Sequence, residues 1–369
     1  MRVADRPSQA LASFRTARCS RRAKLPVPAL LPQGDVPDVC VLRRAPRGGD
    51  RRDRALAQRC SRDTRGSSDV KAPLISVQLC THDRRELIGR VLEALFVQDL
   101  NAADYEIILV DDGSTDDTYD SVLRRVRPTC AFHLVRQANG GLARSRNVGI
   151  ARARGEIILF MDDDVLATAN LLSAHVRFHE RHARSICRGA VINVSSFDHL
   201  PPAKYSLRHY SGAYFWTTNV SVPLAVVKDA GSFDERFREY GWEDLELGYR
   251  LRAAGVASLL ARDALVYHYK PPLSPAQFPR LAEQARAQAR TAVQFLRKHP
   301  HWRVALATGQ MKPMLWWSGV ARRRGWPRLM QKIASANSDG PMTLRLRRWA
   351  AQRAARAAYF EELAVKRTP

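Results

Sequence analysis

Residues 156–164 read Glu-Ile-Ile-Leu-Phe-Met-Asp-Asp-Asp, an apolar stretch that leads directly into three acids. A second stretch of the same kind, Glu-Ile-Ile-Leu-Val-Asp-Asp, occupies residues 106–112. Strands that are apolar on both faces are typical of a parallel sheet covered by helices on both sides. The two stretches therefore predict buried strands whose carboxyl ends, where such sheets bind ligands, carry clustered acids.

Strands and helices alternate around these two stretches. Further strands are expected at 74–80 and 131–136, and helices at 85–98 and 141–154, because apolar residues recur there at the matching spacing. The connections are short, which indicates an α/β fold with a Rossmann-like, mixed and mainly parallel sheet and helices on both faces. We assign residues 71–270 to this central domain.

The charge of the chain is concentrated at its two ends. The 369 residues hold 60 Lys and Arg against 36 Asp and Glu, a net charge of +24. Residues 1–70 contain 16 basic and 7 acidic residues, and residues 271–369 contain 19 and 4, so the central part is neutral. Apolar residues make up 45 %, which excludes a wholly disordered chain, and no apolar run reaches the length of a membrane-spanning helix.

Residues 1–70 mix Arg, Pro, Gly, Ser and Ala without a period, which predicts a basic disordered segment. Three interpretations of it stay open: a tail that binds anionic lipid or nucleic acid, a presequence, or a stretch that is not normally translated. The six cysteines form no C-x-x-C pair and have no histidines at zinc spacing. We therefore expect reduced thiols and a cytoplasmic protein.

Acids follow three of the predicted strands. Asp83 comes shortly after the first strand, and two clusters follow the strands at 106–110 and 156–161: Asp111 with Asp112, and Asp162, Asp163 and Asp164. Carboxylates packed so closely repel one another, so a compensating cation such as Mg²⁺ or Mn²⁺ is expected. The alternative is that aspartates merely form the turns after strands.

A glycine turn follows the third strand. Residues 139–147 read Asn-Gly-Gly-Leu-Ala-Arg-Ser-Arg-Asn, in which the helix N-terminus and two arginines, Arg146 among them, favour an anion. It is not a Walker loop, because no G-x-x-x-x-G-K-[ST] occurs in the chain. Beside the acid clusters, this turn indicates a substrate that carries phosphate.

A third acidic motif begins a helix near residue 243. Glu243 and Asp244 would occupy its first turn, where the helix dipole stabilises ionised carboxylates, next to Trp242. A carboxylate in this position is suitable as a base at an acceptor site. The alternative is a simple acidic first turn of the helix. His268 ends the following strand and is either a structural histidine or, if the strand reaches the same edge of the sheet, a site residue.

Five motifs in order make the chain resemble the family 2 glycosyltransferases, which have the GT-A fold. They are Ser-Val-Gln-Leu-Cys-Thr-His-Asp-Arg from Ser76, Val-Asp-Asp-Gly-Ser-Thr-Asp from Val110, Gly-Leu-Ala-Arg-Ser-Arg-Asn-Val-Gly from Gly141, Phe-Met-Asp-Asp-Asp-Val from Phe160 and Gly-Trp-Glu-Asp-Leu-Glu-Leu from Gly241. The resemblance covers about residues 73–270. It implies an inverting enzyme that moves a sugar from a nucleotide-diphosphate donor to an acceptor hydroxyl, in the synthesis of cell-surface polysaccharide or glycolipid.

The resemblance also implies roles for individual residues. Asp244 resembles the family's general base, and Glu243 would help to hold the acceptor. Asp162 and Asp164 match the outer acids of the D-x-D signature that holds a divalent Mg²⁺ or Mn²⁺, and His268 resembles a histidine that some relatives place on the metal. The nucleotide sugar would be bound by Thr81, Asp83, Asp111, Asp112, Arg146, Asp162, Asp163 and Asn219. Two residues of the first motif, His82 and Asp83, depart from the family's usual aromatic residue and asparagine.

Residues 271–369 predict a basic helical extension. Ser274-Pro275 is typical of a helix start, and Met314-Leu315-Trp316-Trp317 lies near Arg322-Arg323-Arg324 and Trp326. Tryptophans beside a basic run are typical of a helix that binds the surface of an anionic membrane. Two interpretations stay open: peripheral membrane association, with a saccharide or lipid-linked acceptor, and an ordinary helical subdomain with solvated arginines.

Two other classes of protein were weighed. A nucleotidyltransferase also combines a parallel sheet, paired acids and a divalent ion, but it would need a glycine-rich loop after the first strand, where Thr81-His82-Asp83-Arg84 stands. A specific nucleic-acid-binding protein would need basic charge interleaved with aromatic residues across the core, whereas the central part is neutral.

Overall fold

A computed structural model describes residues 38–42, 71–204, 206–336 and 341–367. Their strands form one sheet in the order β1-β4-β3-β2-β5-β8-β7-β9-β6. Its parallel half consists of β4 (Ala131–Arg136), β3 (Tyr105–Asp111), β2 (Ile75–Thr81) and β5 (Ile157–Asp162). All residues of β2 and β3 are buried, as their unbroken apolar sequences predict.

The other half of the sheet is mixed. β8 (Asn219–Pro223) runs antiparallel to β5, β7 (Ser185–Val194) runs antiparallel to β8, and the long β9 (Ala257–Tyr269) runs parallel to β7. The short β6 (Val165–Ala167) pairs with the end of β9, where Val165 is opposite His268. This pairing carries His268 to the part of the chain that follows β5.

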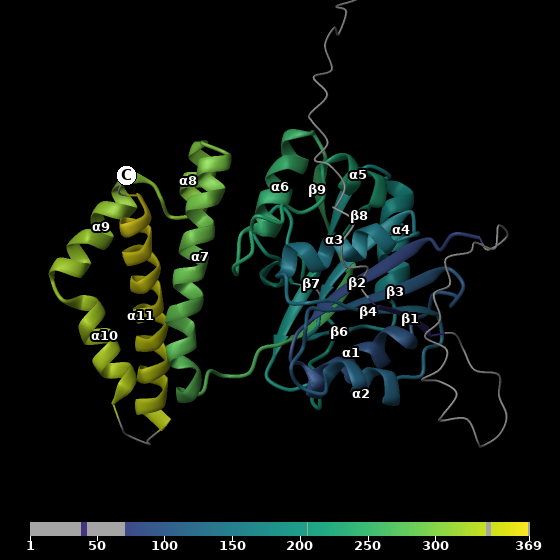
Figure 1. Ribbon diagram of the computed structural model, residues 1–369, viewed down its shortest axis with the longest axis horizontal. Helices are drawn as coiled ribbons and strands as arrows, with labels where there is room; N and C mark the ends of the chain where they lie inside the picture. The colour runs from purple at the N-terminus through teal and green to yellow at the C-terminus, as the bar shows by residue number, and fades with distance from the viewer. Residues whose placement is uncertain (1–37, 43–70, 205, 337–340, 368–369) are drawn as a thin grey trace, which may run out of the picture. The chain divides into compact units, whose positions relative to one another are not determined.

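Helices cover both faces of the sheet (Figure 1). α1 (Arg85–Phe96), α2 (Thr118–Arg125) and α4 (Leu171–Arg181) contribute to one apolar core. α3 (Leu142–Arg152), α5 (Leu224–Asp229) and α6 (Glu243–Ala253) contribute to the core on the other face. The predicted fold class, a mixed and mainly parallel sheet between two layers of helices, is confirmed.

One strand lies where the sequence predicts disorder. β1 (Asp38–Leu42) pairs antiparallel with β4 at the edge of the sheet. Its residues read Asp-Val-Cys-Val-Leu, a short β-forming run that the average composition of residues 1–70 conceals. The expectation of disorder is therefore wrong for these five residues, and the rest of that segment lies outside the described residues.

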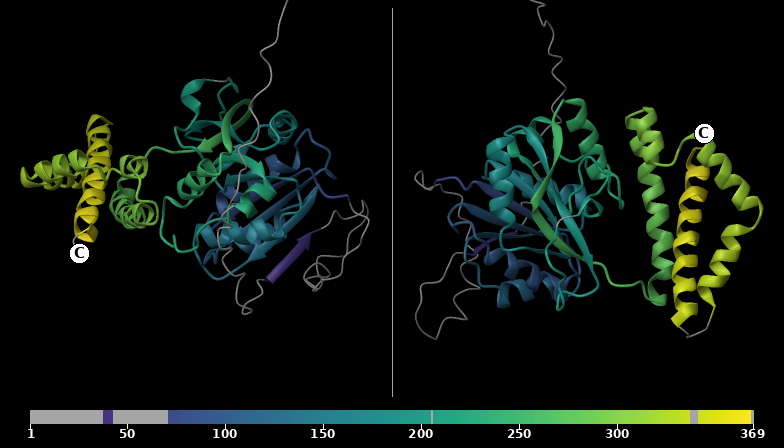
Figure 2. Two further views of the ribbon diagram at one scale, coloured as in Figure 1. Left: turned by 90° about the horizontal axis from the view of Figure 1, so that it is seen from above. Right: turned by 180° about the vertical axis from the view of Figure 1, so that it is seen from behind.

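The C-terminal part is helical, as expected. Ser274 caps the short helical turn Pro275–Gln277 with a capping box, and α7 (Phe278–Lys298) follows. Figure 2 shows α11 (Pro341–Arg367) between α7 and the pair α9 (Lys312–Arg323) and α10 (Trp326–Ser335); the short α8 (Trp302–Ala307) joins α7 to α9. Among the described helices, none combines the length and apolar character needed to cross a membrane.

The strand register brings the acidic strand ends to one edge. Thr81 in β2 is opposite Asp111 in β3, and Cys80 is opposite Asp162 in β5. Because the three strands are parallel neighbours, their carboxyl ends lie side by side, as the sequence predicts.

Candidate active site

Each of the three acids after β5 lies near a polar or basic side chain. Asp162 accepts a hydrogen bond from Thr218 Oγ1 at 2.6 Å. Asp163 lies 3.6 Å from Arg84 Nε, and Asp164 lies 3.4 Å from His268 Nε2. Arg84 Nη2 also lies 3.9 Å from Asp164, so among the described residues one arginine and one histidine form ion-pair contacts with Asp163 and Asp164, and the edge of the sheet remains rich in carboxylates.

Glu243 and Asp244 occupy the first turn of α6, as predicted, and both are buried. The chain enters this helix through two residues with positive φ, Gly241 at 99° and Trp242 at 74°. A tryptophan in the left-handed region is strained, so surrounding contacts must hold it there. One such contact is the hydrogen bond from Trp242 Nε1 to the carbonyl of Gln288, at 2.9 Å.

Arg146 joins the two acidic groups. Its guanidinium is buried and donates from Nη1 to Glu243 Oε1 at 2.7 Å and from Nη2 to Thr217 Oγ1 at 2.8 Å. Nη2 also lies 3.8 Å from Asp162 Oδ1. One side chain from α3 therefore brings the end of β5 and the start of α6 to a shared site, and the predicted acids after β5 and at α6 converge.

The surroundings of Asp244 suit a proton acceptor. The pKa of Asp244 is raised to about 7, first by burial and then by the neighbouring Glu243, against the opposing charge of Arg146. The pKa of Asp163 is also raised to about 7, by burial, against the opposing charge of Arg84. Carboxyl groups with pKa values near neutral pH are characteristic of catalytic sites.

Asp164 and His268 are the pair that best fits a metal ion. His268 Nδ1 lies 3.0 Å from the side-chain oxygen of Asn193, which can only accept a hydrogen bond. This contact orients the ring so that Nε2 faces Asp164 at 3.4 Å, and a nitrogen and a carboxylate in this arrangement are suitable ligands for one cation. Within the described residues no group of three or more His, Cys, Asp and Glu is arranged as a metal site.

Asp112 holds the glycine turn. Its carboxylate accepts from Gln137 Nε2 at 2.8 Å, from Gly140 N at 2.9 Å and from Gly141 N at 2.9 Å. A carboxylate has about four acceptor positions, so one remains for a ligand. Gly141 has φ of 85°, and a Cβ there would lie 2.8 Å from the carbonyl oxygen of Arg238, which explains the glycine.

The other predicted nucleotide residues hold loops of this edge. Asp111 is fully buried and accepts from Ser114 N at 2.7 Å, and the exposed Asp83 accepts from Thr115 N at 2.7 Å. Thr81 is buried and close enough to Asp163 to lower its pKa. These three residues thus lie at the predicted edge, where two of them fix the backbone that follows β3.

Asn219 is not brought to this site. Its amide nitrogen donates to the carbonyls of Ala190 and Ala264, and its oxygen lies 3.0 Å from His175 Nε2. Side chains alternate across a strand, so the preceding Thr218, which contacts Asp162, faces the site instead. The geometry does not support the expectation that Asn219 positions the donor sugar.

Sequence reasoning missed several residues of the site. Thr218, Arg84 and Asn193 contact acids or a histidine named above. Tyr240 is half exposed; burial raises the pKa of its hydroxyl, and so do the nearby acids, Glu243 first. Only Thr218 had a local signal, because it directly precedes a strand; the others reach the site through tertiary packing.

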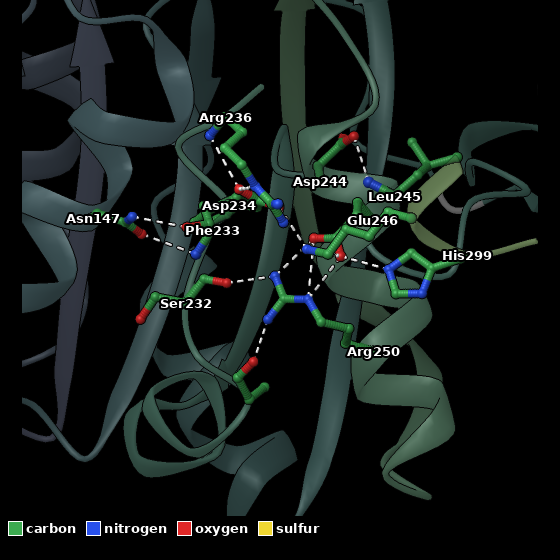
Figure 3. A network of polar contacts seen from close by, with 12 residues as sticks. Asn147, Ser232, Phe233, Asp234, Arg236, Asp244, Leu245, Glu246, Arg250 and His299 are labelled. Carbon is green, nitrogen blue, oxygen red and sulfur yellow. Dashed lines mark hydrogen bonds and ion pairs between the residues drawn. The ribbon is translucent and has the colours of Figure 1, made fainter. Parts of the chain in front are cut away.

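Helix α7 holds the segment that leads into Glu243 and Asp244. Thr291 Oγ1 donates to the carbonyl of Tyr240 at 3.2 Å, and Arg290 Nε donates to Glu239 at 2.8 Å. Figure 3 shows Glu246 between Arg250 of its own helix and His299, which follows α7. Glu246 Oε1 lies 2.7 Å from both Lys298 Nζ and His299 Nε2.

Glu246 is a fully buried carboxylate. Burial acts to raise its pKa, but hydrogen bonds from His299 and Arg250 outweigh it and lower the pKa to about 2. Arg250 continues the network to the carbonyl of Ser232 at 2.6 Å (Figure 3). The backbone around Asp244 is therefore tied to two other segments through charged groups.

The fold is that of the GT-A glycosyltransferases. A solved structure with a similar fold is that of the mannosyltransferase PcManGT from Pyrobaculum calidifontis in complex with GDP-Man and Mn²⁺. The alignment has a TM-score of 0.51 and 19 % identity, and it covers 81 % of this chain and 89 % of that one. It supports the fold.

The sequence comparisons indicate a family. The model described as glycosyl transferase family 2 matches residues 76–223, from β2 to the end of β8. Residues 76–223 are therefore similar to a glycosyltransferase family 2 domain, and the chain resembles the family 2 glycosyltransferases.

Two curated relatives illustrate the family. A validoxylamine A glucosyltransferase from Streptomyces hygroscopicus subsp. jinggangensis is 30 % identical over 230 residues, 52 % of this chain and 54 % of the relative. The poly(ribitol-phosphate) beta-N-acetylglucosaminyltransferase TarS of Staphylococcus aureus is 31 % identical over 108 residues, 29 % of this chain and 19 % of the relative. The chain thus spans about half the length, or less, of these two relatives.

Proposed function

We propose that the chain transfers a sugar from a nucleotide-diphosphate donor to an acceptor hydroxyl, with inversion at the anomeric carbon. The observation that carries the proposal is the convergence of Asp162, Glu243 and Asp244 around the buried Arg146. Asp244, the raised-pKa carboxylate in the first turn of α6, would act as the base, and one base of this kind suits one direct displacement.

The proton transfer is assigned to Asp244. Its pKa of about 7 lets it exist as a carboxylate at neutral pH and still accept a proton as the acceptor oxygen attacks. Glu243, held by Arg146 through Oε1, has its Oε2 buried without a hydrogen-bond partner among the described residues. That free oxygen suits a hydroxyl group of the acceptor.

The diphosphate is assigned to the acidic edge with a divalent cation. Asp164 and His268 would hold the ion, Asp162 would lie beside it, and Asn193 would fix the imidazole. Mg²⁺ and Mn²⁺ are commonly held by one or two protein carboxylates together with substrate phosphates, which agrees with so small a set of ligands. When bound, the ion would stabilise negative charge on the leaving phosphate.

We propose that the nucleotide binds at the edge of the sheet, next to Thr81, Asp83 and Asp112. The remaining acceptor position of Asp112 suits an N–H group of a nucleobase. For the acceptor we propose a saccharide or polyol hydroxyl of a cell-surface glycan or glycolipid. The poly(ribitol-phosphate) acceptor in the name of one relative supports a polymer of this kind.

The direct test is Asp244→Asn. We expect it to abolish transfer while the affinity for the nucleoside diphosphate, measured by calorimetry with Mn²⁺ present, changes little. Asp229→Asn, an exposed acid at the end of α5, is the matched control and should retain full transfer. Normal turnover by Asp244→Asn, or retention of the anomeric configuration in the product, would refute the proposal.

A further inference from the structure

Helix α9 exposes two adjacent tryptophans. Trp316 is 62 % exposed and Trp317 is 65 % exposed, and their rings lie edge to face. No residue of α9 is buried, although the helix contains Met314, Leu315 and Val320. Large apolar side chains gathered on one exposed helix are characteristic of a surface that binds something else.

The same helix carries only positive charge. Lys312 precedes Trp316 by four residues and Arg323 follows it by seven, spacings that place all three on one face of the helix. Arg322 and Arg324 flank Arg323, and all three are exposed. From residue 284 to residue 338 the sequence has eleven Lys and Arg and no Asp or Glu.

These arginines have no polar partner in the part of the chain that the structure describes. Among the described residues, no hydrogen bond or ion pair involves the side chains of Arg322, Arg323 or Arg324. A cavity of about 840 Å³ beside α9 is lined by Leu315, Trp317, Arg322, Trp326 and Phe360 among others. The helix is therefore not tightly packed on its own chain, and its outer face has no intramolecular partner in the described part.

We propose that the outer face of α9, formed by Lys312, Trp316, Trp317, Arg323 and Arg324, docks on an anionic lipid bilayer. Tryptophan rings are suited to the boundary between headgroups and acyl chains, and basic side chains beside them attract anionic headgroups. An acidic protein partner would match the charge but would not need two adjacent tryptophans. The membrane surface satisfies both features at once, and docking is independent of the transfer chemistry.

The test is cosedimentation of the full-length protein with vesicles of phosphatidylglycerol and phosphatidylcholine, with pure phosphatidylcholine vesicles as reference. We expect binding to the anionic vesicles only, and weaker binding as salt is raised. Trp316→Ala with Trp317→Ala, and separately Lys312→Gln with Arg323→Gln and Arg324→Gln, should each lower the partition coefficient about tenfold or more.

Matched controls distinguish binding by this surface from the effects of net charge and of exposed apolar side chains elsewhere. Arg177→Gln with Arg181→Gln and Arg184→Gln removes three exposed arginines from α4 and the residues that follow it. Trp302→Ala with Leu306→Ala removes two exposed apolar side chains from α8. Both controls should bind vesicles nearly as the parent protein does.

Three outcomes would overturn the proposal. One is equal vesicle binding by the parent and the Trp316→Ala, Trp317→Ala variant, with folding of both verified by circular dichroism. Another is an equal loss in the α4 control, which would show that net charge alone drives binding. The third is that the parent protein does not bind vesicles but forms a dimer in analytical ultracentrifugation, and that the Trp316→Ala, Trp317→Ala variant forms no dimer. A second copy of the chain would then cover this face.

Discussion

Arg146 Nη1 donates to Glu243 Oε1 at 2.7 Å, and this buried contact joins residues 97 positions apart in the sequence. The pair connects α3, which follows the glycine turn, to the first turn of α6, which carries the proposed base. Because both groups are almost fully out of water, each supplies the opposite charge that compensates the burial of the other.

Arg146→Met should therefore be strongly destabilising. It leaves Glu243 buried without its cation, and we expect the free energy of unfolding to fall by about 3–5 kcal/mol. Denaturant unfolding measures this change. Arg146→Met combined with Glu243→Gln should regain part of the stability, because no uncompensated charge then remains. Additive losses in the double variant would show that the two residues do not act as a pair.

Transfer should depend on pH through Asp244. Only the carboxylate can accept a proton, so the raised pKa of about 7 means that activity is lost as the pH falls below that value, by about tenfold per unit. Glu243 adds to this shift, so Glu243→Gln should move the midpoint of the pH–kcat/KM profile to lower pH. A profile that stays flat below pH 7, or that Glu243→Gln leaves in place, would argue against Asp244 as the base.

The sequence was sufficient to predict the edge of the sheet and the acids that lie there. Two apolar runs that each end in aspartates allow few arrangements other than buried parallel strands, and Thr81, Asp111 and Asp162 lie at the edge so predicted. Asp244 was also predictable at the start of its helix, because the spacing of apolar residues after it fixes where α6 begins.

The sequence did not predict where single side chains point or which residues they contact. Thr218 and Asn219 are adjacent and both polar, and only the pairing of β8 decides that Thr218 reaches Asp162. Likewise Arg146 was predicted to bind an anionic ligand, whereas its guanidinium holds Glu243 and Thr217. The contacts of α7 with the segment 239–246 arise from packing between distant segments, which no local pattern records.

His268 and Asn193 provide a test of the metal assignment. His268→Ala should raise the Mn²⁺ concentration for half-saturation about 10–100-fold, and Asn193→Ala should raise it about tenfold because the imidazole loses its orienting partner. Titration of Mn²⁺ in the presence of the nucleoside diphosphate, followed by calorimetry, measures this directly. His199→Ala, at an exposed histidine, is the control. Unchanged Mn²⁺ affinity in His268→Ala would remove that residue from the site.

Glu246 should stabilise the protein in a pH-dependent way. Its pKa is lowered from 4.5 to about 2 in the folded chain, so its contribution is fully present above about pH 4.5 and is lost as the pH falls toward 2. We expect Glu246→Gln to reduce the free energy of unfolding by about 3 kcal/mol at neutral pH. The difference from the parent should narrow when urea unfolding is repeated near pH 3.

The same substitution should slow transfer, because Glu246 ties α6 to Lys298 and His299 and so fixes the backbone of Asp244. We expect kcat to fall more than the affinity for the nucleoside diphosphate, whose proposed pocket lies at the strand ends. Glu283→Gln removes a carboxylate that is largely exposed on α7 and should alter neither stability nor kcat. If Glu246→Gln matched that control in both measurements, the network in Figure 3 would have no part in holding the base.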